Sequence, residues 1–401
     1  MDAAGFRELW GDFEPIGRSP EGGYLRYSWT ETDLECRNWF RAQAEKRNLE
    51  VETDRNGNLY AWWGDRHAGD AVLTGSHFDS VPHGGAYDGP LGIVSAFLAV
   101  DELRASGAKR RHPIGIVAFS EEEGGRFGVP CVGTRLMTGA LDADRARDLT
   151  DSDGVTLAEA MDSLNADPSV LGPDPERLRQ IGVFVELHIE QGRALDAEDA
   201  PVGVATAIWP HGRWRFTFTG EANHAGTTRL PDRSDPMLTA AFMILAARKE
   251  ARLAGGVATV GRIESDPGAA NVIAGKVHAW LDARAPDEAV LNAILEGIES
   301  KVSERAGRDG TQVGSRAESE TPVVEFDAAL RDRIASLLGG VPVLPTGAGH
   351  DAGVVSAHVP TAMLFVRNRT GISHAPSETA DDEDCAAGVD ALAAVLRELA
   401  C

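Results

Sequence analysis

The hydrophobic residues of this chain form two different patterns, and each pattern predicts a different kind of sheet. In the first pattern, short runs are apolar at almost every position, which is typical of strands covered on both faces. These runs lie at residues 71–77, 114–120, 181–189 and 361–366. The first run leads into LGIVSAFLAVDEL, which predicts a helix. Strand, helix and strand at this spacing predict parallel neighbours in an α/β domain.

The second pattern is a clean alternation of apolar and polar residues that begins near residue 208. In RWRFTFT the aromatic residues share one face, while arginines and threonines occupy the other. Such alternation predicts a half-exposed antiparallel strand. The elements expected after it are a helix from about 235 to 253, strands at 257–265 and 276–284, and a helix at 287–305. The order βαββα predicts a separate α+β domain inserted into the first.

We therefore predict an α/β fold of two domains, because 401 residues exceed what one simple core accommodates. The first domain, residues 1–207 and 319–401, is expected to hold a mixed, mostly parallel sheet flanked by helices. The second domain is expected at 208–318, with GTQVGSRAESETP as the connection that leads the chain back. Near the start, Asn56-Gly57 between two alternating segments predicts a β-hairpin.

Composition restricts the possible partners and the compartment. The net charge of −23 argues against nucleic acid and anionic membranes as partners. The four cysteines form no CxxC pair, so a reducing compartment is expected. The N-terminus lacks the basic and apolar regions of a signal peptide, and no apolar run approaches the ~18 residues that span a bilayer. We expect a cytoplasmic enzyme.

Histidine and carboxylate side chains follow the predicted buried strands. The set consists of His77, Asp88, Glu122 or Glu123, His188 and His374. A single histidine at a strand end is more often a hydrogen-bonded structural residue. Five such positions at one edge of a sheet are hard to explain by packing, because a buried charge costs several kcal/mol unless it is paired or bound to metal.

These residue types suit two divalent metal ions about 3.5–4 Å apart that share one carboxylate. We expect Asp88 to be the shared carboxylate. His77 and Glu123 are expected on one ion, and His188 and His374 on the other. Asp79 is expected to orient the His77 imidazole by a hydrogen bond, without binding an ion itself.

The three consecutive glutamates 121–123 require separate roles. Neighbouring residues of an extended chain point to opposite sides, so adjacent carboxylates do not all bind one ion. One glutamate can bind metal while the next faces the substrate and transfers a proton. The alternative is a solvated acidic loop, which is less consistent with the end of a buried strand.

Eight motifs, taken in order, resemble a known enzyme family. They are GSHFDSVPHGGAYDG, FSEEEGGRFG, ELHIEQG, GEANHAGTT, GAANVIAG, DAR, GAGHDA and GISHAPSE. The ordered set resembles the N-carbamoyl-L-amino-acid hydrolase and allantoate amidohydrolase family, the amidase branch of a dinuclear metallopeptidase superfamily. The resemblance extends from about residue 20 to residue 395. Each motif is moderately specific alone, and the set is highly specific.

The resemblance implies a metal-binding catalytic α/β domain and a smaller lid that also forms a homodimer. It implies two divalent ions (Zn, or Mn, Co or Ni). The implied ligands are His77, Asp88, Glu123, His188 and His374. Glu122 is implied as the general acid/base, because the family pattern places the catalytic glutamate directly before the ligand.

For the substrate, the resemblance implies Gln191, His224, Asn271, Arg284 and Gly349. Arg284 ends a predicted strand, and its planar guanidinium matches a carboxylate. His224, in NHAG, can donate a hydrogen bond to an oxyanion, and in relatives this histidine reaches the partner subunit's site. Without the resemblance, a surface arginine and a turn asparagine would be the ordinary interpretations of Arg284 and Asn271.

Several positions depart from the family pattern or have an open role. His83 stands where relatives usually have asparagine, as a stray polar contact or an influence on metal choice. Arg367 and Arg369 either favour a dianionic substrate such as allantoate or are surface charges, and the second interpretation is preferred. His350 is interpreted as a structural partner near a helix start rather than as a ligand.

The resulting hypothesis is an amidohydrolase that cleaves a linear ureido or carbamoyl C–N bond in a substrate that bears a carboxylate. A metal-bound hydroxide attacks the carbamoyl carbon, Glu122 moves the proton, His224 stabilises the oxyanion and Arg284 holds the carboxylate. The first alternative is an aminopeptidase, carboxypeptidase or aminoacylase of the same superfamily. The second is an inactive metal-binding scaffold, which the complete ligand set and the presence of Glu122 disfavour.

Overall fold

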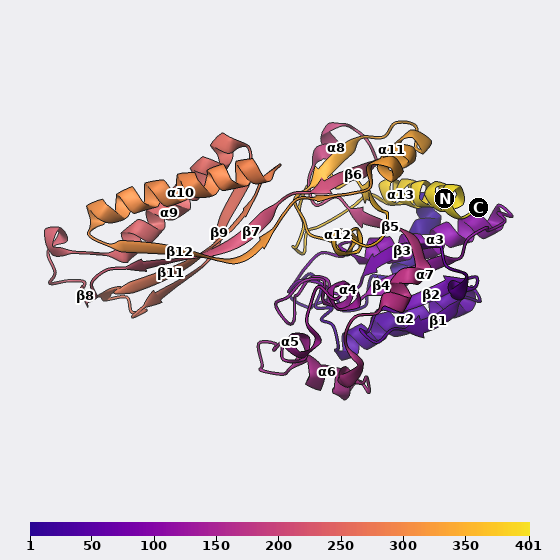
Figure 1. The fold of residues 1–401 in the computed structure, drawn as a ribbon, viewed down its shortest axis with the longest axis horizontal. Coiled ribbons are helices and arrows are strands. Elements are labelled where there is room, and N and C mark those ends of the chain that lie inside the picture. The colour runs from indigo at the N-terminus through magenta and orange to yellow at the C-terminus, as the bar shows by residue number, and fades with distance from the viewer. The chain divides into compact units, whose positions relative to one another are not determined.

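The computed structural model describes residues 1–401, and the chain divides into two compact units. The first unit comprises Met1–Thr206 and Glu325–Cys401, and the second comprises Ala207–Val324 (Figure 1). The sequence places these boundaries at residues 207 and 319 instead. The lid and dimerisation roles expected for the second unit stay predictions. None of the helices combines the length and apolar character that crossing a membrane requires.

The first unit is built on a nine-stranded mixed sheet whose centre is parallel. Its order is β1-β2-β4-β3-β5-β15-β6-β13, with β14 beside β6. The neighbours β4, β3, β5 and β15 run parallel, whereas β1, β2 and β6 pair antiparallel with their neighbours. The strands are β1 Glu50–Thr53, β2 Leu59–Trp63, β3 Ala71–His77, β4 Ile114–Phe119, β5 Ile181–Ile189, β6 Val202–Ile208, β13 Val324–Glu325, β14 Val343–Thr346 and β15 Thr361–Val366.

Helices cover both faces of this sheet, as its wholly buried central strands require. Helices α3 and α13 pack on one face with α1, α2 and α11 beside them, and α4, α7 and α12 lie on the other. The helices of the first unit are α1 Ala3–Phe13, α2 Glu31–Lys46, α3 Pro90–Ala105, α4 Val132–Thr138, α5 Ala143–Arg147, α6 Leu157–Ser163, α7 Pro175–Gln180, α8 Ala194–Ala197, α11 Ala328–Leu337, α12 Asp351–Val355 and α13 Asp382–Ala400. The predicted α/β fold class is confirmed.

Helix α3 is buried on almost every side, which explains why its sequence shows no polar face. It contacts β3, β5 and α13. Its Gly92 lies so close to β5 that an added Cβ would stand 2.3 Å from the carbonyl oxygen of Leu187. This close approach fixes the helix against the strand that ends one residue after His188. Glycine at position 92 therefore sets the depth at which α3 packs beside the sheet edge.

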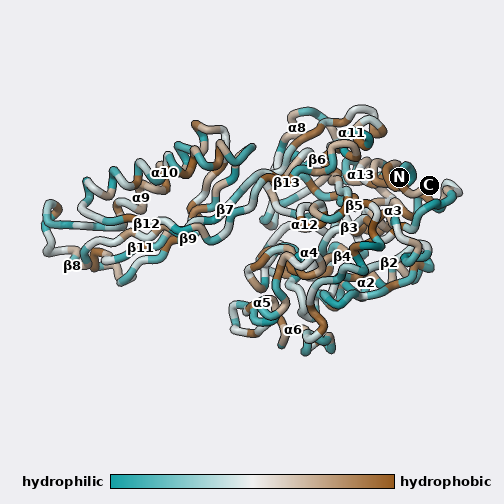
Figure 2. The backbone as a smooth tube through the Cα atoms, viewed as in Figure 1, coloured by the Kyte–Doolittle hydropathy of each residue, from teal (hydrophilic) through white to brown (hydrophobic).

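The second unit contains a four-stranded antiparallel sheet with two long helices. The sheet order is β12-β7-β11-β9, and β8 and β10 form a separate short pair. Apolar residues of β7 and β11 pack with α9 and α10, and the alternation along β7 can be followed in Figure 2. The elements are β7 His211–Thr219, β8 Asn223–His224, α9 Pro236–Ala254, β9 Val257–Asp266, β10 Val272–Ile273, β11 Lys276–Arg284, α10 Glu288–Asp309 and β12 Gln312–Thr321.

The predicted βαββα order of the second unit is incomplete. The stretch expected as a returning connection forms β12, which pairs with β7 along its length. Almost every residue of β12 is exposed, and Val313 is the apolar residue that joins the core. A polar strand exposed on both faces carries neither the alternation nor the apolar run by which strands are recognised. The second unit therefore extends to Val324.

A pair of glycine-to-alanine substitutions tests the close packing of α3. Gly92→Ala is expected to lower the free energy of unfolding by about 1–3 kcal/mol, because the new methyl group displaces the β5 carbonyl. Gly11→Ala, in α1, meets no atom within 4 Å and is expected to raise it by about 0.5–1 kcal/mol. Urea denaturation followed by circular dichroism measures both. Equal effects of the two substitutions would contradict the close contact.

Candidate metal centre

The parallel strands bring four chain segments to one edge of the sheet. His77 is the last residue of β3, and His188 is the second-last residue of its neighbour β5. Glutamates 121–123 follow β4, on the other side of β3, and His374 lies in the loop after β15. Asp88 directly precedes Gly89, the N-cap of α3. The carboxyl edge of a parallel sheet is where open α/β folds place their ligands, and the sequence predicted this convergence.

Asp88 joins two groups of possible metal ligands. Its Oδ1 lies 3.2 Å from His188 Nε2 and 3.7 Å from His77 Nε2. Its Oδ2 lies 3.3 Å from His374 Nε2, and that nitrogen lies 3.4 Å from Glu123 Oε2. Asp88 therefore belongs both to a group with His77 and His188 and to a group with Glu123 and His374.

This grouping corrects the predicted one. The sequence predicts His77 with Glu123 and His188 with His374, whereas the structure groups His77 with His188 and Glu123 with His374. The structure pairs the two buried histidines because β3 and β5 are direct neighbours. Strand order determines which ligands lie together, and the spacing of motifs along the chain does not predict strand order. The expectation that Asp88 occupies the shared position agrees with the geometry.

The two buried imidazoles are oriented to offer a lone pair to a cation. His77 Nδ1 lies 2.9 Å from the carbonyl oxygen of Asp79, and His188 Nδ1 lies 2.9 Å from that of Ile189. A carbonyl only accepts, so each Nδ1 carries a hydrogen, and each ring in its neutral form presents the lone pair of Nε2. Both Nε2 atoms are buried without a hydrogen-bond partner. A cation between them and Asp88 satisfies all three groups, so the residues fit a divalent metal ion.

The electrostatics of the centre also favour cations. Burial favours the neutral form of His188, but the neighbouring Asp88 carboxylate outweighs it and raises the pKa of His188 to about 9, so a bound cation would take the place of a proton on Nε2. Burial raises the pKa of Glu122 well above its usual range, and the carboxylates of Asp351 and Glu123 raise it further. The buried space therefore holds more acidic groups than cationic side chains. Bound cations would neutralise this excess negative charge.

Asp79 holds the glutamate loop in place by its side chain. Its two carboxylate oxygens accept hydrogen bonds from the backbone N–H groups of Glu122, at 3.1 Å, and Glu123, at 2.9 Å. The contact with the His77 ring is made by the Asp79 backbone carbonyl, whereas the carboxylate lies 3.7 Å from Nδ1. His77 Nδ1–H therefore donates to the backbone carbonyl of Asp79, where the sequence predicts the Asp79 side chain as the partner.

The three glutamates point in different directions, because they lie in a loop that begins with a left-handed φ of 54° at Glu121 rather than in an extended strand. Glu121 turns away and accepts hydrogen bonds from the backbone N–H groups of Arg126 and Phe127. Glu123 faces His374. Glu122 is buried, and its Oε2 lies 3.7 Å from His77 Nε2. Glu122 belongs to none of the three candidate ligand groups, which leaves its carboxyl group available for proton transfer.

Two buried acidic positions near the centre were missed from the sequence. Glu378 Oε1 accepts the backbone N–H groups of Tyr87, at 2.9 Å, and Asp88, at 3.0 Å, and so fixes the loop that carries Asp88. Glu186 accepts from Ser76 Oγ and from the N–H of Ala352. The sequence holds a signal for each residue. Glu186 lies two residues before His188, on the same face of β5, and Glu378 is the last residue of the GISHAPSE motif.

Glu186 also lies in a third candidate ligand group, with His188 and His350. The His350 ring packs against the His188 ring, with centroids 4.5 Å apart, and directly precedes α12. Its position at a helix start agrees with the predicted structural place.

Gln191 and Gly349 belong to the first unit with the ligands. Gln191 Nε2 donates to Asp88 Oδ2 at 2.8 Å and to Ser373 Oγ at 3.0 Å, and its Oε1 is buried without a partner. Gly349 is exposed and has no atom within 4 Å of the position of an added Cβ. Gln191 therefore lies at the ligand cluster, and Gly349 leaves open space before α12.

His224, Asn271 and Arg284 belong to the second unit. The short β8–β10 pair brings the first two together, because His224 pairs with Val272 and the N–H of Ala225 donates to the Asn271 carbonyl at 3.1 Å. His224 Nδ1 accepts the N–H groups of Gly226 and Thr227, so its Nε2 carries the hydrogen and is a donor. Arg284, at the end of β11, contacts Asp282 at 2.9 Å.

Arg367, Arg369 and His83 have partners outside the ligand cluster. Arg367 is not the surface charge that the sequence favours, because it is buried and donates two 2.8 Å hydrogen bonds to the Asp384 carboxylate in a structural ion pair. Arg369 is half exposed and pairs with Asp381. His83 Nδ1 lies 2.9 Å from the carbonyl oxygen of Gly22, and His83 belongs to none of the ligand groups.

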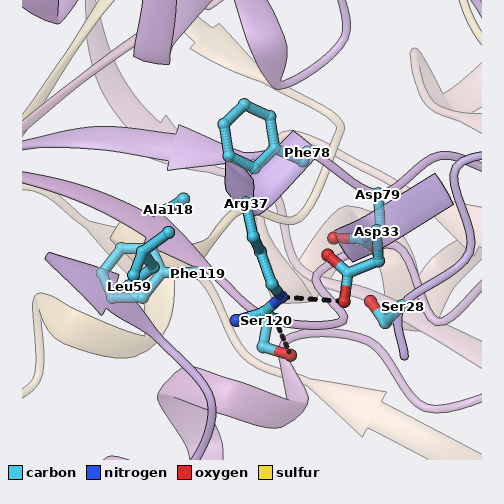
Figure 3. A pocket seen from close by; sticks show the side chains of 9 residues that line it. All are labelled: Ser28, Asp33, Arg37, Leu59, Phe78, Asp79, Ala118, Phe119 and Ser120. Atoms are coloured by element: carbon cyan, nitrogen blue, oxygen red, sulfur yellow. Dashed lines mark hydrogen bonds and ion pairs between the residues drawn. The ribbon is translucent and has the colours of Figure 1, made fainter. Parts of the chain in front are cut away.

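A small internal cavity lies behind Asp79 and the glutamate loop. Its volume is about 10 Å³, which is close to the space that one water molecule needs. Figure 3 shows the Arg37–Asp33 ion pair beside Asp79, with a second contact from Arg37 to Ser120. The cavity is too small for a substrate, and its lining ties α2 to the strand ends that carry the centre.

Comparison with known proteins gives consistent matches over nearly the whole chain. The model of peptidase family M20/M25/M40 matches residues 73–398. An N-carbamoyl-L-amino acid amidohydrolase of Geobacillus stearothermophilus is 36% identical over 96% of this chain and 95% of its own length. Allantoate amidohydrolase of Escherichia coli is 34% identical, with the same two coverages of 96% and 95%. A hydantoinase/carbamoylase family amidase of Burkholderia multivorans has a TM-score of 0.88 at 31% identity, covering 100% of this chain and 98% of that one.

The grouping around Asp88 predicts how substitutions change the metal content. Within a group, His77→Ala and His188→Ala are expected to remove the same ion, so the double variant keeps about one ion per subunit. Across groups, His77→Ala combined with His374→Ala is expected to remove both ions. Mass-spectrometric metal analysis after dialysis measures this, with circular dichroism as the control for folding. A within-group double variant that loses all metal while it stays folded would contradict the grouping.

Proposed function

The chain belongs to peptidase family M20/M25/M40, and from this premise we propose that it hydrolyses a linear ureido or carbamoyl C–N bond in a substrate that bears a carboxylate. It is a metal-dependent amidohydrolase, an enzyme of the class that acts on C–N bonds other than peptide bonds. An N-carbamoyl-L-amino acid or allantoate is the proposed substrate. The observation that carries the proposal is Asp88, shared by two ligand groups, with the unliganded Glu122 beside them.

We propose that the centre holds two divalent ions, Zn or alternatively Mn, Co or Ni. His77, His188 and Asp88 would hold one, and Asp88, Glu123 and His374 the other. Bound there, the ions would supply Lewis acidity toward the substrate carbonyl and lower the pKa of a water molecule. Nitrogen and carboxylate ligands suit this set of metals.

Glu122 is the proposed general acid/base. Burial raises its pKa well above the usual range, which favours uptake of a proton that the carboxyl group can return to a leaving nitrogen. Oε2 is the oxygen that faces the His77 side of the centre. Asp79 fixes the backbone on either side of this oxygen through the N–H groups of Glu122 and Glu123, so the carboxyl group keeps its direction.

The second unit supplies the proposed contacts to the substrate. The Nε2–H of His224 is a donor suited to a developing oxyanion, because Nδ1 is occupied as an acceptor. Arg284 offers a planar guanidinium to the substrate carboxylate. Asn271, on the strand pair with His224, is proposed to bind the carboxylate or the ureido end. Gln191 and Gly349 are proposed substrate contacts from the first unit.

We also propose that the second unit acts as a lid and joins two copies into a homodimer. Helix α9 exposes Leu238 and Leu245, seven residues apart and therefore on one face, with 52% and 68% of their surfaces accessible. The outer strands β9 and β12 each pair on one side only, which leaves two free edges. Exposed leucines and free strand edges are features that a second copy covers.

We propose a cytoplasmic location because the cysteines form no disulfide bonds. All four are free thiols, and three are buried in the first unit. Free thiols are typical of a reducing compartment.

A single substitution tests the role of Glu122. Glu122→Gln is expected to keep the fold and the bound metal but to lower turnover by about 10²–10⁴-fold, because the amide neither accepts nor returns the proton. Glu198→Gln, at an exposed glutamate of the same unit, serves as the matched control and should keep full turnover. Steady-state ammonia release measures both. Near-wild-type turnover in the metal-loaded Glu122→Gln protein would exclude the assignment.

A substrate panel tests the proposed bond. Ammonia release is expected from N-carbamoyl-L-amino acids, allantoate or β-ureidopropionate, and not from dipeptides, which an aminopeptidase or carboxypeptidase would cleave instead. N-acetyl amino acids test for an aminoacylase. Exhaustive chelation should abolish the activity, and added Zn, Mn, Co or Ni should restore it. Activity that survives chelation, or cleavage of dipeptides alone, would contradict the proposal, and no turnover of any compound would favour the inactive scaffold.

A further inference from the structure

The segment that begins α4 holds the glutamate loop by three consecutive backbone hydrogen bonds. The N–H of Cys131 donates to the carbonyl of Glu122 at 2.7 Å, that of Val132 to Glu121 at 2.9 Å, and that of Gly133 to Ser120 at 2.9 Å. The first turn of α4 therefore runs along the loop that follows β4. Any shift of residues 131–133 moves Glu122 with it.

Cys131 also contacts the side chain of Glu122. Its Sγ lies 3.6 Å from Glu122 Oε1, and both side chains are buried, with Cys131 6% and Glu122 5% accessible. A thiol S–H is a weak donor, and a carboxylate oxygen accepts from it. Burial raises the pKa of the Cys131 thiol well above its usual value, and the negative charge of Glu122 raises it further, so the hydrogen stays on sulfur.

The two oxygens of Glu122 consequently have different surroundings. Oε1 faces the Cys131 thiol, and Oε2 faces His77 Nε2 at 3.7 Å. A donor on Oε1 restrains rotation of the carboxyl group and leaves Oε2 as the oxygen free to exchange a proton. Cys131 belongs to none of the candidate ligand groups, so its proposed effect on the reaction passes through Glu122.

The backbone at Cys131 adds an independent sign that the side chain matters. Its φ of +55° and ψ of +39° lie in the left-handed region, which favours glycine over residues with a Cβ. Strained conformations of this kind persist where the surroundings impose them and are frequent at functional positions. Glycine would adopt this backbone conformation with less strain than cysteine. The chain nevertheless has cysteine here, which indicates that the thiol has a role of its own.

We propose that Cys131 is a positioning residue for Glu122, whose thiol holds Oε1 and thereby aims Oε2 at the reacting atoms. This inference rests on the proposed role of Glu122 as general acid/base. It assigns no chemistry to the sulfur atom. The thiol stays reduced and protonated throughout.

Three substitutions separate this role from a merely structural one. Cys131→Gly removes the thiol and relaxes the backbone, so the protein should unfold at an equal or higher urea concentration than wild type. Its kcat should nevertheless fall by about 10–100-fold with KM unchanged, because the carboxyl group loses its direction. Cys131→Ala should lower kcat similarly. Cys131→Ser retains an O–H donor and should restore most of kcat. Folded Gly and Ala variants with kcat within twofold of wild type would overturn the proposal.

An infrared measurement tests the contact without turnover. The S–H stretching band of Cys131 is isolated as the difference between wild type and Cys131→Ala, and the hydrogen bond predicts that Glu122→Gln shifts this band. Cys401→Ala, at the half-buried C-terminus, is the control and should leave the Cys131 band in place. A Cys131 band that is unchanged by Glu122→Gln would overturn the positioning role, whereas absent turnover by wild type would overturn the proposed function alone.

Discussion

The structure of the centre depends on one carboxylate, Asp88, on which two buried imidazoles converge. His77 and His188 both direct Nε2 toward Asp88 Oδ1, because their Nδ1 hydrogens are bonded to backbone carbonyls. Lone pairs that face one another in a buried space are unfavourable unless positive charge lies between them. The arrangement is thus stable as a cation site, and the other Asp88 oxygen faces Nε2 of the more exposed His374 at 3.3 Å.

The fold supports this carboxylate from several directions. Glu378 fixes the backbone of the Asp88 loop, and Asp79 and the first turn of α4 fix the glutamate loop. The close contact between Gly92 and Leu187 fixes α3, whose N-terminus directly follows Asp88, against the strand that carries His188. Each support is either a hydrogen bond, accepted by a buried carboxylate or a backbone carbonyl, or a close backbone contact. The centre is accordingly preorganised by the same packing that forms the core.

The sequence predicts the α/β fold and the residues at the strand ends, because wholly apolar strands and the polar residues that end them are local features. It does not predict which ligands share an ion, since His77 meets His188 through the pairing of β3 with β5, which joins residues far apart in the chain. Polar strand β12 was missed because it buries almost nothing. The role of Arg367 was left open because its partner Asp384 lies on another element. Local pattern reveals candidate residues, and strand order decides their partners.

The central claim is that Asp88 lies between two metal ions. X-ray absorption spectroscopy of the zinc-loaded protein tests it directly, because two bridged ions scatter from one another. The account predicts a zinc–zinc distance of about 3.5–4 Å in the wild type, with nitrogen and oxygen neighbours and no sulfur ligand. A spectrum from the fully loaded, active protein that contains no metal–metal scattering would contradict it.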